Sequence, residues 1–283
     1  MNSLSDLFRQ IGLQKLDTHL WHILLSATTI QIIFLASCWL SSPISHYARL
    51  APTKKASWGM HVVSMIFSLA ICTLAVPVFY TPELAADKLF GYSYYSGIVY
   101  SIACGYFLWD ICVSVYYIEE CGIGFVAHAV ACFSVFILSF RPFLYYYGSV
   151  FLMFEISTVF LNIHWFCDKT GRAGTTLQWV NGIILLTTFF SVRLVFGIYQ
   201  SMRFFMTCFE QWDSVPKYLF IVYAMSNILL CSLNIFWFSR MIKSVVSRFK
   251  GNTDTQGDGT YGKMRKATSK VGARTAGSNK KQA

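Results

Sequence analysis

Long apolar stretches alternate with short polar segments along most of the chain. Seven of these stretches come close to or exceed the roughly 20 helical residues that span a bilayer core about 30 Å thick. They cover 20–40, 58–80, 93–118, 123–140, 143–166, 175–199 and 218–238. Strict period-two alternation is absent, and most stretches are about twice as long as a membrane β-strand, so helices are predicted. The pattern therefore indicates an all-α polytopic membrane protein with about seven transmembrane helices.

Composition and charge placement add a topology to this prediction. Hydrophobic residues make up 55% of the 283 residues and charged residues only 13%, against roughly a quarter charged in a soluble domain. The net charge of +10 is concentrated in residues 240–283, which hold 11 Lys and Arg against 2 Asp, a net charge of +9. By the positive-inside rule this end is cytosolic, and alternating back places the basic loops 41–57 and 168–174 in the cytosol as well. An odd number of spans then puts the N-terminus in the lumen.

The C-terminal end also carries a candidate sorting signal. Lys280 and Lys281 occupy the fourth and third positions from the end of the chain, which resembles the dilysine retrieval signal of endoplasmic-reticulum membrane proteins. Such signals are read by receptors, here the coat-protein retrieval machinery, and are not anchors. Chance in a lysine-rich tail is the alternative. Nucleic-acid binding is not predicted, because Tyr261 is the one aromatic residue within the basic segment after residue 250.

Polar residues inside the apolar stretches are the candidates for function, because they are costly in lipid. They are Asp110, His128, Glu155, Asn162, Asn181 and Arg193, and Ser157 and Thr158 accompany them in the fifth stretch. At 1.5 Å per residue, Asp110, His128, Glu155 and the two asparagines fall toward the cytosolic half, and Arg193 lies nearer the other side. Interhelical hydrogen bonding without further function is the alternative for each of them. Two carboxylates and a histidine at compatible depths favour a shared site.

Motifs for metals and cofactors are missing. The nine cysteines form no Cys-x-x-Cys pair, and the six histidines form neither His-x-x-x-His nor His-Glu-x-x-His, so the usual zinc spacings are absent. Gly-x-Gly-x-x-Gly, Gly-x-Ser-x-Gly and phosphate-binding loops are absent too. No metal site and no cofactor are predicted.

Two sequence blocks stand out within the apolar stretches. Residues 155–166 read Glu-Ile-Ser-Thr-Val-Phe-Leu-Asn-Ile-His-Trp-Phe, and 105–110 read Gly-Tyr-Phe-Leu-Trp-Asp. These blocks resemble the family of TLC domains, which groups translocating-chain-associated proteins, ceramide synthases and their relatives. His128 stands where the family has one or two histidines, and the segment from Asn181-Gly182 to Arg193 resembles a later helix. Val159 replaces the family's usual proline, so the kink that a proline produces is not expected there. Ala129 follows His128, and the His-Asp-x-x-Asp element of ceramide synthases has no counterpart, so the chain resembles the branch linked to membrane-lipid homeostasis.

The resemblance implies a domain layout and two classes of function. The layout is an amphipathic segment (1–19), a first span with its basic loop (20–57), a TLC domain of six helices in a barrel-like bundle (58–240) and a disordered basic tail (241–283). In the first class, the protein binds or regulates membrane lipids in the endoplasmic reticulum. In the second, it transfers acyl groups from acyl-CoA, with His128 as base or acceptor and Asp110 or Glu155 orienting the imidazole. A transporter is a third alternative, although no inverted repeat is visible.

Overall fold

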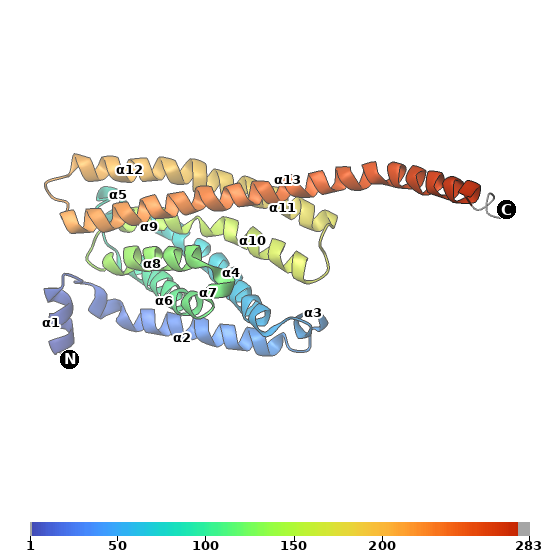
Figure 1. Cartoon of the computed structure of the whole chain (residues 1–283). Coiled ribbons are helices and arrows are strands. Elements are labelled where there is room, and N and C mark those ends of the chain that lie inside the picture. The colour runs from blue at the N-terminus through green and yellow to red at the C-terminus, as the bar shows by residue number, and fades with distance from the viewer. Residues whose placement is uncertain (1, 277–283) are drawn as a thin grey trace. The chain divides into compact units, whose positions relative to one another are not determined.

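The computed structural model of the chain describes residues 2–276 and contains helices and no strands within that range. The elements are α1 (Asn2–Gln10), α2 (Leu16–Leu40), α3 (Ser45–Ala48), α4 (Pro52–Ala75), the 3₁₀ segment η1 (Val76–Tyr80), α5 (Pro82–Ala86), α6 (Tyr94–Tyr116), α7 (Ile118–Cys121), α8 (Ile123–Leu138), α9 (Tyr145–Leu152), α10 (Glu155–Lys169), α11 (Thr176–Phe189), the π-helical segment η2 (Phe190–Phe196), α12 (Gly197–Glu210) and α13 (Lys217–Ala276) (Figure 1). The all-α prediction is confirmed.

Within the described residues, six helical stretches are long and apolar enough to cross a membrane. They are Leu16–Leu40, Pro52–Tyr80, Tyr94–Tyr116, Tyr145–Lys169, Thr176–Glu210 and Lys217–Val246. The shorter apolar helix α8 occupies the place of the fourth predicted span, and its 16 residues rise about 24 Å, less than the bilayer core. Large apolar side chains remain exposed on outer faces, among them Trp21, Ile183 and Ile228. This distribution fits a polytopic protein whose outer surface meets lipid.

Two predicted spans differ in detail from the observed helices. The stretch 143–166 is two helices, because the chain turns at Met153 and Phe154 between α9 and α10. Backbone bonds from Phe154 to Phe151 and from Ile156 to Met153 show the tighter i→i+3 pattern of this turn. α10 runs unbroken through Val159, which agrees with the absence of a proline there. The stretch 175–199 continues as helix to Glu210, beyond the apolar residues, because an existing helix extends without a new nucleus.

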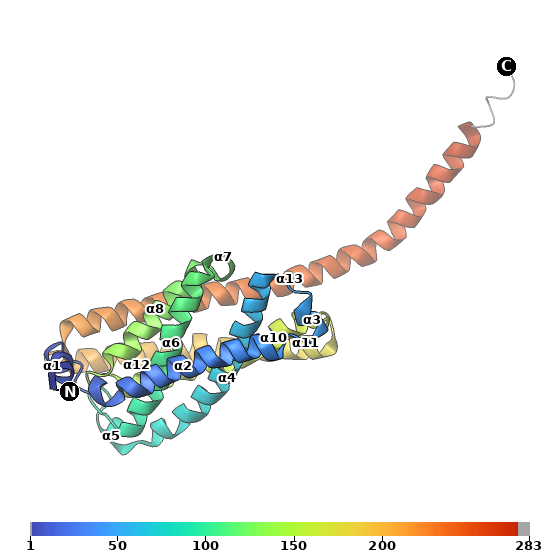
Figure 2. The same cartoon turned by 90° about the horizontal axis from the view of Figure 1, so that it is seen from below.

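Close contact between α2 and α6 organises one side of the bundle, where α2 lies across α6 and α4 (Figure 2). Gly105 of α6 makes this possible: a Cβ atom there would lie 2.5 Å from the Cβ of Ser26 and 2.6 Å from the carbonyl oxygen of Ile23. Small residues let membrane helices approach in this way. The absence of a side chain at Gly105 therefore sets the distance between the two helices.

Replacing Gly105 with alanine should destabilise the bundle by about 1–3 kcal/mol, because the added methyl overlaps backbone that cannot easily move. Equilibrium unfolding in mild detergent measures the change. Gly124→Ala in α8 is the matched control, since a Cβ there would have its nearest neighbour, Leu233, at 3.7 Å. Equal stability of Gly105→Ala and the control would contradict this account of the helix contact.

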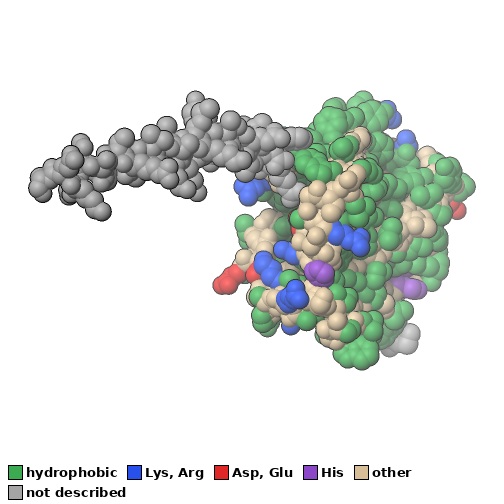
Figure 3. Space-filling view, turned by 90° about the vertical axis from the view of Figure 1, so that its right-hand side faces the viewer, with side chains coloured by type: hydrophobic (Ala, Val, Ile, Leu, Met, Phe, Trp, Pro, Cys, Tyr) green, Lys and Arg blue, Asp and Glu red, His purple; other side chains and the backbone are tan. Residues whose placement is uncertain are grey.

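The loops predicted to be cytosolic lie at one end of the bundle. Figure 1 shows α3 and the turn between α10 and α11 at the same end, and Figure 3 shows Lys and Arg side chains gathered there. Lys54 forms a salt bridge with Glu120 of α7, and its hydrogen bond lowers the pKa of the Glu120 carboxyl. Lys169 lies over the ring of Trp165. The shared end agrees with a topology in which these loops face one side of the membrane.

The chain forms two units, Met1–Ile235 and Phe236–Ala283, and the candidate functional site belongs to the first. α13 continues as helix to Ala276, whereas the sequence predicts a disordered tail over 241–283. Because helix propagation adds one residue at a time to an existing helix, the backbone can stay helical through a segment with few apolar residues. Lys280 and Lys281 lie outside the described residues.

Candidate functional site

A ladder of polar side chains joins α4 to α10. His61, Ser64 and Ser68 recur at i, i+3 and i+7, so they share one face of α4. The Oδ1 atom of Asn162 lies 2.7 Å from Nδ1 of His61, and its Nδ2 donates to Oγ of Ser64 at 3.1 Å. One helical turn further along α4, Oγ of Ser68 donates a hydrogen bond to Oε2 of Glu155 at 2.9 Å. The ladder therefore fixes the Glu155 carboxylate from the α4 side.

Arg193 holds the same carboxylate from the other side. Its Nε donates to Oγ of Ser157 at 2.9 Å, and its Nη2 donates to Oγ1 of Thr158 at 2.9 Å. Its Nη1 donates to Oδ1 of Asn234 on α13 at 3.2 Å. Nη2 also lies 3.7 Å from Oε1 of Glu155, and the exposed fractions of Arg193 and Glu155 are 6% and 9%. The result is a buried ion pair whose members are also hydrogen-bonded, as buried charges require.

The backbone around Arg193 is unusual. Arg193 lies in the π-helical segment η2, and single π-turns are frequent at functional sites. The rings of Phe154 and Phe189 flank its guanidinium at 5.7 and 5.1 Å, within the range of cation–π attraction. Gly197 lets this contact form, because a Cβ there would lie 2.6 Å from the Phe154 ring. The segment thus holds a charge at a fixed position among apolar side chains.

A cavity adjoins the ion pair. It holds about 850 Å³ of empty space, part of it continuous with the surroundings, and lies between α6, α8, α9, α10, η2, α12 and α13. Most of the wall is apolar or aromatic, and its larger members are Phe107, Phe136, Leu144, Tyr147, Phe151, Leu152, Phe154, Phe204, Tyr223 and Leu230. Among residues 5–246, whose side chains are described, the charged side chains of the wall are those of Glu155 and Arg193.

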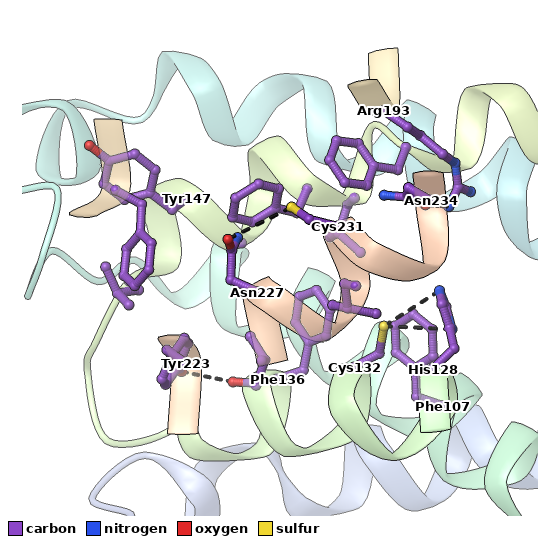
Figure 4. Close-up of a pocket in the computed structure, with 18 of the residues that line it drawn as sticks. Phe107, His128, Cys132, Phe136, Tyr147, Arg193, Tyr223, Asn227, Cys231 and Asn234 are labelled. Carbon is purple, nitrogen blue, oxygen red and sulfur yellow. Dashed lines mark hydrogen bonds between the residues drawn. The ribbon is translucent and has the colours of Figure 1, made fainter. Parts of the chain in front are cut away.

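The cavity is polar at one end. Figure 4 shows Arg193, Asn234 and His128 toward one end and Tyr147 and Tyr223 toward the other. Asn234 is 3% exposed and comes from α13, whereas His128 comes from α8. Polar groups from three elements therefore converge at one end of an otherwise apolar space.

At the other end of the cavity, Tyr147 and Tyr223 present their rings to the cavity, while their hydroxyl groups bond elsewhere. The Oη of Tyr147 lies 2.7 Å from Oγ1 of Thr207. The Oη of Tyr223 donates to the carbonyl oxygen of Val135 at 2.7 Å and lies 2.8 Å from Oγ of Ser139. Because both hydroxyls are already bonded to neighbouring helices, this end of the cavity behaves as an apolar one.

Comparisons with known proteins show the family of the chain. A family profile described as the TLC domain matches residues 57–243. The chain belongs to the TLC domain family. It is 40% identical to an uncharacterised TLC domain-containing protein of Schizosaccharomyces pombe, and the aligned region covers 86% of this chain and 84% of that one. It is 33% identical to the Topoisomerase I damage affected protein 4 of Saccharomyces cerevisiae (80% of this chain, 84% of that one) and 24% identical to human TLC domain-containing protein 4 (78% and 87%). No solved structure matches the chain.

The structure of this TLC domain brings together part of the predicted site. His128 and Glu155 both line the cavity, and Arg193 lines it with them. Asp110 is not among the lining residues, and its Oδ1 accepts a hydrogen bond from Ser114 one turn along α6 at 3.2 Å. The sequence groups Asp110 with the other two because depth along a helix can be estimated from residue count, whereas direction around the axis cannot.

Arg193 is closer to Glu155 than the sequence predicts. Residue count places it nearer the opposite side of the membrane, yet its guanidinium meets the carboxylate. Side chains on a helix point toward its N-terminus, and the long arginine side chain therefore reaches back along η2 toward the level of Glu155.

The remaining predicted residues of the TLC domain connect helices. Ser157 and Thr158 accept from Arg193. Asn162 bonds α4 as described, and Nδ2 of Asn181 donates to the carbonyl oxygen of Phe160 at 2.9 Å, which joins α11 to α10. For the two asparagines the structure favours the alternative of interhelical hydrogen bonding.

Several contributing residues escape the sequence prediction. The polar stripe of His61, Ser64 and Ser68 and the pair Asn227 and Asn234 all lie in predicted spans at helical spacing. That spacing is the signal that would have found them. Among the side chains that the structure describes, no group of three or more His, Cys, Asp or Glu lies together to hold a metal ion.

Proposed function

We propose that this protein resides in the endoplasmic-reticulum membrane, binds membrane lipid inside its helical bundle and so regulates phospholipid or sphingolipid composition. The observation that carries the proposal is the cavity, which is apolar along most of its wall and has one ion pair at one end. A membrane lipid has the same division into a long apolar part and one polar head. Burial of apolar chain, at about 25 cal/mol per Å², and hydrogen bonds at one end would hold it in one orientation.

Lipid that co-purifies with the protein tests this proposal. The protein is extracted in mild detergent and purified, and its bound lipids are identified by mass spectrometry beside those of the membrane it came from. We expect one lipid class to be enriched at near-stoichiometric amount, because a defined cavity selects its ligand. A lipid profile equal to that of the surrounding membrane would contradict the proposal.

Acyl transfer from acyl-CoA is the second candidate function. His128 favours it, because its ring lines the cavity and both ring nitrogens lie 3.8 Å from Sγ of Cys132. An imidazole at such a wall can act as general base. Purified protein incubated with labelled acyl-CoA and a lipid acceptor should then form acylated product, and His128→Ala should lose it. His46→Ala on α3, outside the cavity, is the control. Absence of product with the wild-type protein removes this candidate.

Residence in the endoplasmic reticulum, with a lumenal N-terminus and a cytosolic C-terminus, rests on the basic loops and on Lys280 and Lys281. Replacing both lysines with serine should release part of the protein to post-Golgi membranes, because the retrieval machinery no longer reads the dilysine. Microscopy and glycan-maturation state of a lumenal tag measure the change. Replacement of Lys263 and Lys266 is the control, since it removes equal charge. Unchanged localisation would reduce the dilysine to coincidence.

A further inference from the structure

The charges at the polar end of the cavity balance. Arg193 contributes one positive charge and Glu155 one negative charge, 3.7 Å apart. No other Asp, Glu, Lys or Arg within residues 5–246 lines this cavity. A charged head group placed here would therefore find no uncompensated charge of opposite sign.

The hydrogen-bonding capacity of Arg193 is also largely occupied. Its bonds to Ser157, Thr158 and Asn234 use three N–H groups of the five that a guanidinium carries. What remains is enough for one or two hydrogen bonds to a hydroxyl or carbonyl oxygen. It is too little for the several charge-assisted bonds by which proteins hold a phosphate group, with its three or more acceptor oxygens.

We infer that the cavity selects lipids whose head group is uncharged and hydrogen-bonding, and that Glu155 determines this selectivity. The inference rests on the proposed function, since it specifies the class of lipid that the cavity takes. Glu155 acts in two ways. It compensates the charge of Arg193, and it repels an approaching anionic head in a medium of low dielectric constant, where such repulsion is strong.

The position of Glu155 fits this role. Its Oε2 accepts from Ser68 and its Oε1 faces Arg193, so the carboxylate has a fixed orientation between α4 and η2. Exchange of this carboxylate for an amide keeps the size of the side chain and an acceptor for Ser68. It leaves Arg193 with an uncompensated charge beside the cavity, and the cavity should then attract an anionic head.

Two lipids that differ by one phosphate provide the test. 1-Oleoylglycerol and its 3-phosphate compete against a fluorescent monoacylglycerol for the purified full-length protein in nanodiscs. We expect the wild-type protein to prefer the uncharged lipid by about tenfold or more, and Glu155→Gln to reverse the preference. Glu155→Gln/Arg193→Gln, which is again balanced in charge, should lose the affinity for the phosphate. Asp110→Asn removes a carboxylate outside the cavity wall and should leave the preference unchanged.

The outcomes separate this inference from the proposed function. If the monoacylglycerol probe does not bind, the inference fails, and the lipids that co-purify with the protein decide whether the proposed function stands. If the wild-type protein binds the phosphate as well as or better than the uncharged lipid, the inference fails while lipid binding stands. If folded Glu155→Gln keeps the wild-type preference, Glu155 is not the determinant, and selectivity by head-group size replaces selectivity by charge.

Should Glu155→Gln not fold, the wild-type comparison decides the head-group class. The charge-balanced double variant then decides whether the preference survives without the ion pair.

Discussion

Replacement of Arg193 with methionine should lower the free energy of unfolding by about 3–5 kcal/mol, the cost typical of removing one member of a buried ion pair. The change leaves the Glu155 carboxylate buried with Ser68 as its remaining described partner, and it removes the donors to Ser157, Thr158 and Asn234. Methionine is similar in length, so packing changes little. Equilibrium unfolding in detergent micelles measures the effect.

Two further variants show whether the effect comes from the ion pair. Arg203→Met changes an exposed arginine on α12 and should alter stability by less than about 0.5 kcal/mol. Glu155→Leu/Arg193→Met removes both charges and should be more stable than Arg193→Met alone, because an unpaired buried charge costs more than none. A double variant that is as unstable as Arg193→Met alone, or less stable, would contradict the pairing.

Filling the cavity should reduce lipid occupancy by at least about tenfold. Cys231 lies on the cavity face of α13, between the polar end and the tyrosine end, so Cys231→Phe places a ring where the proposed acyl chain runs. Its hydrogen bonds to Asn227 and Ser201 are long sulfur contacts of 3.8 and 3.7 Å, and their loss should cost little stability.

The neighbouring position provides the control for this variant. Ser232 is exposed on the other face of α13, so Ser232→Phe adds the same bulk outside the cavity and should leave occupancy unchanged. Quantitative mass spectrometry of co-purified lipid measures both variants. Equal occupancy in the two would mean that bound lipid sits on the outer surface and not in the cavity.

Periodicity and length predict most of the fold. An apolar run of sufficient length must be helical in a bilayer, and the structure places a helix in each of the seven predicted stretches. The details that escape prediction are those set by tertiary contacts. The turn at Met153–Phe154 and the π-helical turn at Arg193 have no marker in the local sequence, since neither Pro nor Gly occurs at those positions.

The site could be predicted in part. Glu155, His128 and Arg193 follow from the cost of polar groups in lipid, whereas the partnership between Arg193 and Glu155 depends on the direction and length of a side chain. Asp110 shows the opposite error, because a suitable depth does not bring a residue to the cavity. The sequence prediction does not include Asn234, although its side chain accepts a hydrogen bond from Arg193. The partner of a side-chain amide depends on which helix lies opposite it, and the sequence does not show this.

The orientation of a bound lipid tests the central claim most directly. A monoacylglycerol carrying a photoreactive diazirine at the far end of its chain is added to membranes containing the protein, irradiated, and its adducts are mapped by mass spectrometry. The account predicts adducts at the apolar end of the cavity, because the head would lie at Arg193 and Glu155. The expected positions are Tyr147 and Tyr223 and Phe204, whose ring centroid lies 6.0 Å from that of Tyr147. Adducts confined to outward-facing residues such as Trp21, Ile183 and Ile228 would contradict it.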